Sequence, residues 1–311
     1  MSHTLIQDTL FTAETVRNLD SLAIEKQGIP SIVLMKRAGR AVLSELLDAF
    51  GTPSLLNVFC GSGSNGGDGY IVAALAAQKN IVVRCYEMEG NLGADAAQAK
   101  LFAQQANVSF YSIGTNTELD QGVVVDSLLG IGLTGELRQP YIDAIELING
   151  SGLPVVAVDI PSGLNSDTGA ALGAVVQADI TVTFIGAKQG LFSGRGIAVC
   201  GEVIYDSLDI DEDLFTQVDA SAELMDLFDL LEEIPATSED TYKTQRGHSM
   251  VVGGDHGFGG AAIMAAEACL KVGAGMVSVA TRPEHVAAVL ARQPEVMACG
   301  VTSGQQLEPL L

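Results

Sequence analysis

Three acidic residues stand where chemistry can be expected. Asp68, Asp126 and Asp159 each follow an apolar run of the kind that forms a buried strand, the first of them after a glycine-rich loop. The carboxyl ends of parallel strands meet at one edge of a sheet, where ligands of open α/β folds bind. Any one of these acids alone could be a turn or cap residue. Together, beside glycine turns, they favour a site where carboxylates move protons or stabilise positive charge.

The glycine-rich loop that leads to Asp68 has the pattern of an anion-binding site. Residues 61–66 read Gly-Ser-Gly-Ser-Asn-Gly, between the apolar run 55–60 and a helix-forming segment. Backbone amides of such a loop, with the positive end of the helix dipole, can hold a phosphate. With Glu87 about twenty residues further on, the pattern also matches the dinucleotide fingerprint. Short glycine patterns can instead serve only to pack a helix on a sheet.

Oxygen ligands dominate the same predicted edge. They come from Asn65, Asp126 and Ser162, and no His or Cys accompanies them. Hard oxygen donors with little negative charge suit an alkali cation or magnesium and argue against zinc. Lys188 follows a further predicted strand, 180–184, and is equally compatible with a surface lysine and with a phosphate or acid/base partner.

The elements that must position these residues alternate between strand and helix. Apolar β-rich runs indicate strands, and segments with helical spacing or N-terminal caps lie between them. This order predicts βαβ units and a mainly parallel sheet. The expected strands are 55–60, 81–87, 108–112, 123–126, 155–159 and 180–184; the expected helices are 12–26 with Thr12 as N-cap, one capped by Ser31, 70–76, 93–106 and 140–149.

Composition excludes several classes of function. The formal net charge of −22 over 311 residues opposes binding to nucleic acid or anionic membranes. No apolar run approaches the ~18 residues of a membrane span, and residues 1–11 lack a secretory signal. Five scattered cysteines suit a reducing compartment, so we expect a cytoplasmic protein.

A change of composition divides the chain. Residues 206–240 contain thirteen acids and neither Lys nor Arg, which is typical of a solvated face or a linker. We expect domains at 1–215 and 244–311, joined by an acidic linker at 216–243. The second domain begins with another strand, glycine loop and helix, and its length is below the usual ~100–150 residues of a domain.

Three motifs in register give the chain a resemblance to a known family. They are Asn65-Gly66-Gly67-Asp68-Gly69, then 126–132 (Asp-Ser-Leu-Leu-Gly-Ile-Gly), then 159–163 (Asp-Ile-Pro-Ser-Gly). Over residues 10–210 the chain resembles the NAD(P)H-hydrate epimerases. From about Lys243 it is similar to the start of the ADP-dependent NAD(P)H-hydrate dehydratases, so that the whole resembles the bifunctional NAD(P)H-hydrate repair family.

The resemblance implies a Rossmann-like three-layer α/β/α domain followed by the start of a ribokinase-like α/β domain. The first would interconvert the R and S forms of NADH or NADPH hydroxylated at C6 (NADHX and NADPHX), with one bound potassium ion. The implied potassium ligands are Asn65, Asp126 and Ser162. The implied substrate contacts are Ser64, Asn65, Gly66, Gly67, Asp68, Gly130, Ile131, Gly132, Leu133, Thr134, Gly135, Glu136, Asp159 and Lys188. Ser64 replaces an Asn common in the family.

Loss of a hydroxyl next to a ring nitrogen leaves a delocalised cation, which a carboxylate can stabilise while it exchanges protons with water. Asp159 and Asp126 are the catalytic candidates, with Asp159 favoured as the proton carrier. We also expect a homo-oligomer.

The dehydratase resemblance is weaker. Residues 242–245 read Tyr-Lys-Thr-Gln where relatives often read His-Lys-Gly-Asp. The anion hole and catalytic aspartate of that family would lie beyond Leu311, so we expect dehydration, with ADP or ATP, only from a longer chain. The alternatives are an NAD(P)-dependent oxidoreductase, which would use Glu87, and a non-catalytic nucleotide-binding module.

Overall fold

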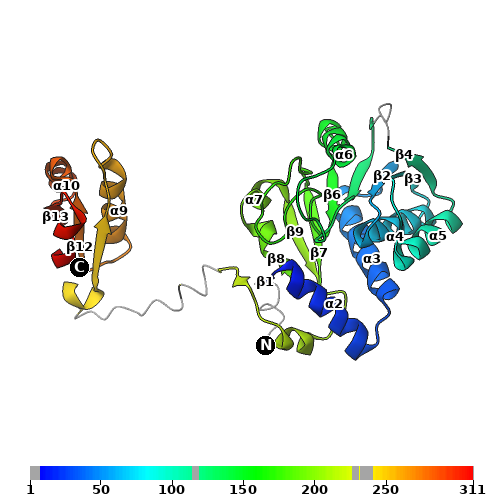
Figure 1. Cartoon of the computed structure of the whole chain (residues 1–311), viewed down its shortest axis with the longest axis horizontal. Coiled ribbons are helices and arrows are strands. Elements are labelled where there is room, and N and C mark those ends of the chain that lie inside the picture. The colour runs from blue at the N-terminus through cyan, green and yellow to red at the C-terminus, as the bar shows by residue number, and fades with distance from the viewer. Residues whose placement is uncertain (1–7, 114–118, 226–230, 232–240, 311) are drawn as a thin grey trace. The chain divides into compact units, whose positions relative to one another are not determined.

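The computed structural model describes residues 8–113, 119–225, 231 and 241–310. The chain divides into two compact units, 1–226 and 227–311 (Figure 1). The acidic segment expected to form a linker from 216 therefore contributes its first part to the first unit. There, Ala222 pairs with Leu10 across two short antiparallel strands.

A parallel sheet of seven strands forms the centre of the first unit. Its order is β4-β3-β2-β5-β6-β7-β9, and every described neighbour pair is parallel. The strands are β2 Leu55–Cys60, β3 Val82–Glu87, β4 Ser109–Ser112, β5 Val123–Ser127, β6 Val155–Val158, β7 Ile180–Phe184 and β9 Glu202–Asp206. The predicted α/β class with a mainly parallel sheet is confirmed. Strand β9 was not predicted.

Helices cover both faces of this sheet. They are α2 Ala13–Gln27, α3 Ser31–Phe50, α4 Ser64–Gln78, α5 Ala94–Gln105, α6 Gln139–Gly150 and α7 Gly196–Val199. Side chains of α3, α4 and α5 pack in one core against the sheet, and those of α6 in a second core. Thr12 caps α2 as predicted, by accepting a hydrogen bond from the Thr15 amide. For α3 the expected cap is wrong, because Ser31 is already helical and Pro30 precedes it as N-cap.

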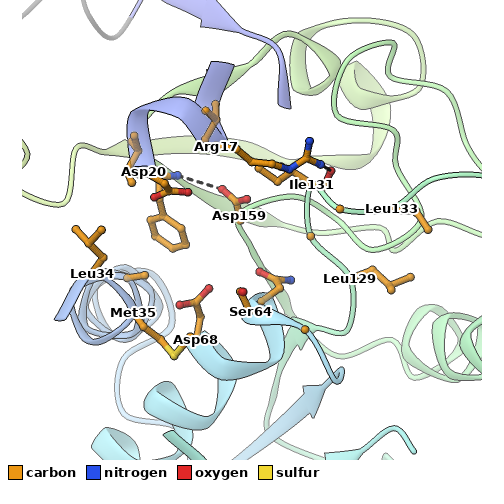
Figure 2. Close-up of a pocket in the computed structure, with 18 of the residues that line it drawn as sticks. Arg17, Asp20, Leu34, Met35, Ser64, Asp68, Leu129, Ile131, Leu133 and Asp159 are labelled. Atoms are coloured by element: carbon orange, nitrogen blue, oxygen red, sulfur yellow. Dashed lines mark hydrogen bonds between the residues drawn. The ribbon is translucent and has the colours of Figure 1, made fainter. Parts of the chain in front are cut away.

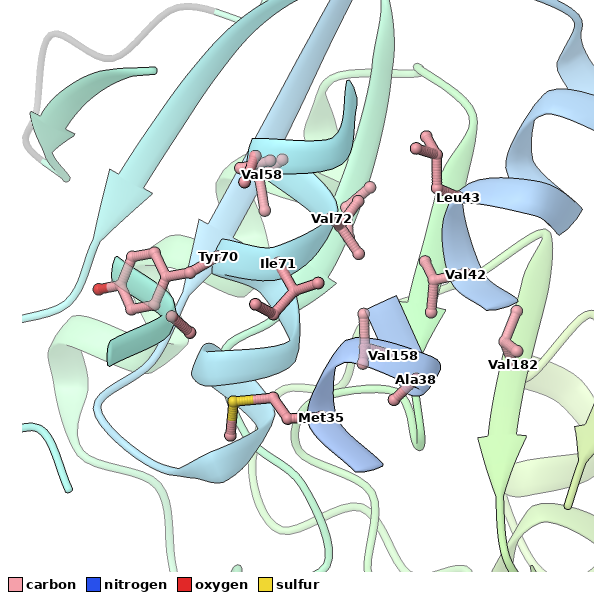
Figure 3. Close-up of a cluster of buried hydrophobic side chains, with 14 of the residues drawn as sticks. Met35, Ala38, Val42, Leu43, Val58, Tyr70, Ile71, Val72, Val158 and Val182 are labelled. Atoms are coloured by element: carbon pink, nitrogen blue, oxygen red, sulfur yellow. The ribbon is translucent and has the colours of Figure 1, made fainter. Parts of the chain in front are cut away.

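Alternation along the strands sends side chains to the two cores. Val58 lies in the core under α3 and α4, and the next residue, Phe59, lies in the core with α6. Figure 3 shows the first core, where Val42 and Ile71 from the two helices meet Val158 of the sheet. All of these are fully buried. Each such aliphatic side chain contributes about 1.5–3 kcal/mol on burial.

A smaller sheet and several 3-10 turns complete the first unit. The smaller sheet has the order β10-β1-β8, with β1 Thr9–Phe11, β8 Ala187–Lys188 and β10 Ala222–Glu223. The turns are η1 Gln189–Phe192 and η2 Glu212–Gln217. Strand β8 carries Lys188 and is held by its parallel pairing with β1. The N-terminal segment thereby fixes a residue of the predicted site.

The second unit is a parallel sheet of three strands in the order β11-β12-β13. Its elements are β11 His248–Val252, α9 Gly260–Lys271, β12 Met276–Thr281, α10 Val286–Arg292 and β13 Met297–Gly300, with 3-10 turns η3 Lys243–Arg246, η4 Pro283–His285, η5 Gly304–Gln306 and η6 Glu308–Leu310. Its small core includes Ala266, Val277 and Val279. Within the described parts of both units, no helix has the length and apolarity to cross a membrane.

The strand order creates a switch point beside β2. After β2 the chain adds β3 and β4 on one side, then returns so that β5 pairs with the other side of β2. The loops after β2 and β5 therefore diverge at one place, where open α/β sheets bind ligands. Gly61 permits the close approach of these loops, because a Cβ there would lie 1.8 Å from the carbonyl oxygen of Leu128.

Candidate functional site

A pocket of about 690 Å³ opens at this switch point. Its walls come from α2, α3, the start of α4, the loop after β5 and the ends of β6, β7 and β8. Such a volume suits a small-molecule or cofactor ligand. The loop residues Ser62 and Gly63 and the first residue of α4, Ser64, line it, so the positive end of that helix dipole faces the pocket.

Most of the predicted substrate contacts line this pocket. They are Ser64, Asn65, Asp68, Gly130, Ile131, Gly132, Leu133, Thr134, Asp159 and Lys188. The other predicted residues are not among the described residues that line it: Gly66, Gly67, Gly135, Glu136, Asp126 and Ser162. For Gly66 the structure gives a packing reason, because a Cβ there would lie 1.9 Å from the carbonyl oxygen of Gly61.

Asp159 and Lys188 form a buried ion pair at the pocket wall. The Lys188 side chain is 1% exposed, and its ammonium contacts Oδ1 of Asp159. The same ammonium donates hydrogen bonds of 3.0 Å to Oγ1 of Thr183 and to the carbonyl oxygen of Phe184. Lys188 is therefore a buried partner of the acid rather than a surface lysine.

The backbone at Asp159 is strained. Its φ is +67°, and Ile185, which also lines the pocket, has a φ of +64°. Residues other than glycine rarely adopt this left-handed region, and a β-branched residue there is a clear outlier. Strain of this kind concentrates at functional sites, where the surrounding structure holds a side chain in one position. Asp159 is thus fixed both by its backbone and by Lys188.

Asp126 is satisfied in another way. It is fully buried, and its Oδ1 accepts hydrogen bonds from Oγ of Ser162 at 2.6 Å and from the Leu128 amide at 3.2 Å, while Oδ2 accepts from the Ser162 amide at 2.8 Å. Burial raises the pKa of Asp126 to about 6, against the opposing effect of these hydrogen bonds. An acid so enclosed supports the loops better than it serves proton transfer to a ligand.

The amide of Asn65 lies close to this hydrogen-bonded pair. A Cβ on Gly130 would lie 3.1 Å from Cβ of Asn65, and the neighbouring Leu129 donates a 2.9 Å hydrogen bond from its amide to Oγ of Ser162. Both polar atoms of the Asn65 side chain are buried without a hydrogen-bond partner in the part of the chain that the structure describes. Such unpaired atoms are costly unless a ligand or ion satisfies them. Asn65, Asp126 and Ser162 thus place side-chain oxygen atoms around one loop, and this donor chemistry would suit a hard cation.

Asp20 is a pocket residue that the sequence analysis did not identify. It lies on α2, whose N-terminus is fixed by a 2.7 Å hydrogen bond from the Ala13 amide to Asp167. Burial, with the neighbouring charge of Asp159, raises the pKa of Asp20 to about 6 although Lys188 opposes the shift. The sequence feature that could have indicated Asp20 is its position in α2 between the buried residues Val16 and Ala23.

Arg17 and Asp68 occupy the two sides of the pocket seen in Figure 2. Arg17, on α2, donates a 2.9 Å hydrogen bond to the carbonyl oxygen of Ile131 and so ties that helix to the loop after β5. Asp68 points into the pocket from α4. Burial and the nearby carboxyl groups of Asp159 and Asp20 raise the pKa of Asp68 well above its usual value.

Glu87 forms its contacts within the fold. Its Oε1 accepts a 2.7 Å hydrogen bond from the Tyr70 hydroxyl and pairs with the Lys100 ammonium at 2.6 Å. Glu87 is not among the described residues that line the pocket. This arrangement weighs against the oxidoreductase alternative, which needs that carboxylate for a ribose.

An open parallel sheet with a pocket at its switch point and a helix N-terminus at the pocket wall defines a Rossmann-like ligand-binding α/β protein. Residues 31–190 match the family of the YjeF-related protein N-terminus, and residues 249–311 match the NAD(P)H-hydrate dehydratase family. The chain belongs to the YjeF-related protein N-terminus family.

Relatives with curated names match nearly the whole chain. The bifunctional NAD(P)H-hydrate repair enzyme Nnr of Coxiella burnetii is 40% identical over 304 residues, which cover 97% of this chain and 62% of that protein. Nnr of Escherichia coli is 36% identical over 307 residues, covering 98% and 59%. The chain therefore spans less than two thirds of the length of these relatives. The resemblance to the repair family is confirmed.

A crystal structure of the yeast protein ynu0 (YNL200c) has the same fold. It superposes with a TM-score of 0.58 at 17% sequence identity, covering 70% of this chain and 95% of the yeast chain. At this level of identity the likeness concerns the fold alone.

Proposed function

We propose that the first unit interconverts the R and S epimers of hydrated nicotinamide cofactors, NADHX and NADPHX. The observation that carries the proposal is the strained, lysine-paired Asp159 in the pocket at the switch point. A carboxylate held in this way can stabilise a positive charge that develops on a bound ring. The family and the names of the relatives support this substrate class.

Different residues around the pocket would bind the substrate and carry out the chemistry. The backbone amides at the start of α4, with Ser64, bind the negative pyrophosphate by donating hydrogen bonds to it. The loop from Gly130 to Thr134, tied to α2 by Arg17, encloses the substrate. The departing hydroxyl at C6 leaves a cation delocalised over the ring nitrogen, and the carboxylate of Asp159 stabilises it. Water then adds to the ring and completes the change of configuration.

Potassium is part of the proposal. Asn65, Asp126 and Ser162 would hold the ion, because Asn65 offers a buried amide oxygen with no described partner and Asp126 offers a buried carboxylate. When bound, potassium supplies a positive charge that compensates the carboxylate and stabilises the loop after β5. Proton transfer remains with the pocket residues.

The second unit suggests a coupled step. The match of residues 249–311 to the NAD(P)H-hydrate dehydratase family supports ADP- or ATP-dependent dehydration of the S epimer as the step coupled to epimerisation. Assembly of this chain into a homo-oligomer remains a prediction.

Separation of the epimers by chromatography tests the proposed function. The chain is incubated with purified R-hydrate in potassium buffer and, in parallel, in tetramethylammonium buffer. We expect the S epimer to appear until equilibrium is reached, faster with potassium, and without any oxidation of NADH to NAD⁺. No interconversion in potassium, by a protein shown to be folded, would contradict the proposal.

A further inference from the structure

Three carboxyl groups line the pocket, and one buried ammonium stands among them. Asp20 comes from α2, Asp68 from α4 and Asp159 from the end of β6. Only Asp159 pairs with Lys188. Across the described residues, the carboxyl groups of Asp20 and Asp68 form no hydrogen bond or ion pair. The pocket therefore contains more acid than its buried lysine can neutralise.

Asp68 and Asp159 approach the pocket from different sides. In Figure 2, Asp68 lies with Ser64 on the α4 side, whereas Asp159 lies with Asp20 and Arg17 on the opposite side. A flat ring that enters the space between them would present one face to each carboxyl group.

Inversion at C6 places a chemical demand on such a site. The hydroxyl leaves from one face of the ring, and water must arrive at the other. The leaving oxygen needs a proton, and the arriving water must lose one. A pair of acid/base groups, one on each face, meets both needs without movement of either group.

We propose that Asp68 is the second catalytic residue of the epimerase, acting on the ring face opposite to Asp159. This assignment rests on the proposed function and differs from our expectation for Asp126, which is enclosed by Ser162 and Leu128.

The charges around Asp68 differ from those around Asp159. The groups that face Asp68 are Asp159, Asp20 and Lys188; burial and the two acids raise its pKa, and the lysine opposes them. These influences favour the protonated form of Asp68, whereas Asp159 has the buried ammonium of Lys188 as its partner. Two carboxyl groups in such different surroundings suit the roles of one acid and one base.

The step balances in both directions. The C6–O bond breaks, its electron pair leaves with the oxygen, and the proton of Asp68 converts that oxygen to water. A second water forms a C–O bond on the opposite face and gives one proton to Asp159. The reverse reaction starts from protonated Asp159 and ionised Asp68, and solvent resets the two states.

Solvent labelled with oxygen-18 tests the assignment. Each purified epimer is incubated in labelled water with the wild-type chain, with Asp68→Asn, and with Glu25→Gln, an exposed acid of α2, as the control. The epimers are then separated, and the oxygen-18 content of each is measured by mass spectrometry. Asn has nearly the shape of the protonated acid, so the fold should be retained.

We expect the wild type and the control to incorporate one solvent oxygen with each inversion. In Asp68→Asn inversion should fall by about 10²- to 10⁴-fold, with KM changed less than about fivefold. Label should still enter with retention of configuration in the epimer whose hydroxyl faces Asp159. If Asp68 had only a structural role, its substitution would slow the incorporation of solvent oxygen and the inversion at C6 to the same extent.

Two results would overturn the proposal. One is inversion by Asp68→Asn within about threefold of the wild type; the other is an equal loss of exchange and inversion for both epimers. If the variant does not fold, the wild type decides: its kcat/KM must fall at high pH in both directions, because the Asp68/Asp159 pair then loses the single proton that each direction needs. A pH profile without this fall contradicts the role. Absence of exchange and inversion in the wild type would contradict the proposed function instead.

Discussion

Asp126 lies at the end of β5 and Asp159 follows the neighbouring strand β6, yet the protein accommodates the two acids differently. Asp126 is enclosed by neutral donors from Ser162 and Leu128. Asp159 has a buried lysine as partner, a left-handed backbone and access to the pocket. The difference teaches that burial alone does not identify a reactive acid: access to a ligand and the charge of the partner decide what it can do.

The comparison is tested most strongly at Asp159. In Asp159→Asn we expect kcat for epimer interconversion to fall by about 10²- to 10⁴-fold, since the amide can neither carry the proton nor stabilise the cation. Chromatography of the two epimers measures the loss. If Asp126→Asn caused the larger loss in potassium-saturated buffer, the roles of the two acids would be reversed.

Removal of the lysine should affect stability. Lys188→Met leaves the carboxylate of Asp159 without its counter-ion, and breaking a buried pair in this way costs about 3–5 kcal/mol in the free energy of unfolding. Urea unfolding measures it. The double variant Lys188→Met/Asp159→Asn should regain part of the stability but no activity. A single variant as stable as the wild type would show that the ion pair is not needed for the fold.

The role of Asp126 can be tested by the dependence of stability on potassium. Asp126→Asn should lower the free energy of unfolding by about 1–3 kcal/mol. The asparagine has one acceptor oxygen instead of two, so at least one of the three groups that donate to Asp126 (the Ser162 hydroxyl, the Ser162 amide and the Leu128 amide) would be left without a partner. We expect potassium to raise the Tm of the wild type above its value in tetramethylammonium, and Asp126→Asn should abolish this rise. Calorimetry at matched ionic strength makes the comparison. An unchanged potassium-dependent rise in Tm would exclude Asp126 as a ligand.

The smallest expected effect concerns pH and Asp20. Its pKa in the folded protein, about 6, lies above the ~3.9 of an unfolded chain. As pH rises, the unfolded state ionises first, so this residue lowers stability between about pH 4 and 6 and remains unfavourable above. Asp20→Asn should therefore be more stable than the wild type at pH 8 by about 1–2 kcal/mol, and by much less at pH 4.

Urea midpoints at the two pH values check the Asp20 prediction, with Glu25→Gln as the control. A stability difference that is the same at both pH values would show that the ionisation of Asp20 carries no penalty in the folded state.

The fold was predictable from local patterns. Uninterrupted apolar runs such as 123–126 indicated strands buried on both faces, and the intervening helices implied parallel connections. Strand β9 escaped prediction because its side chains are only half-buried and acids stand at both its ends. Ser31 was misjudged as a cap because Pro30 already provides the extended backbone that precedes the helix.

The candidate site was predictable only in part. Glycine turns and acids at strand ends are local signals, so Ser64, Asn65, Asp68 and Asp159 could be assigned to one edge from the sequence alone. The loop 130–134 followed from the resemblance. Asp20 could not be assigned to the site, because the helical spacing of an acid does not show whether its side chain faces a pocket or which charged groups lie on the other side of that pocket.

By itself, the sequence determined which residues end the parallel strands and that these ends share one edge, because strand polarity and period follow from the local pattern. Only the tertiary structure decided which acid faces the pocket, which is enclosed, and that Lys188 is the buried partner of Asp159. Those outcomes depend on the order of the strands in the sheet and on α2 and β8, which come to the pocket from distant parts of the chain. The local spacing of residues encodes none of these arrangements.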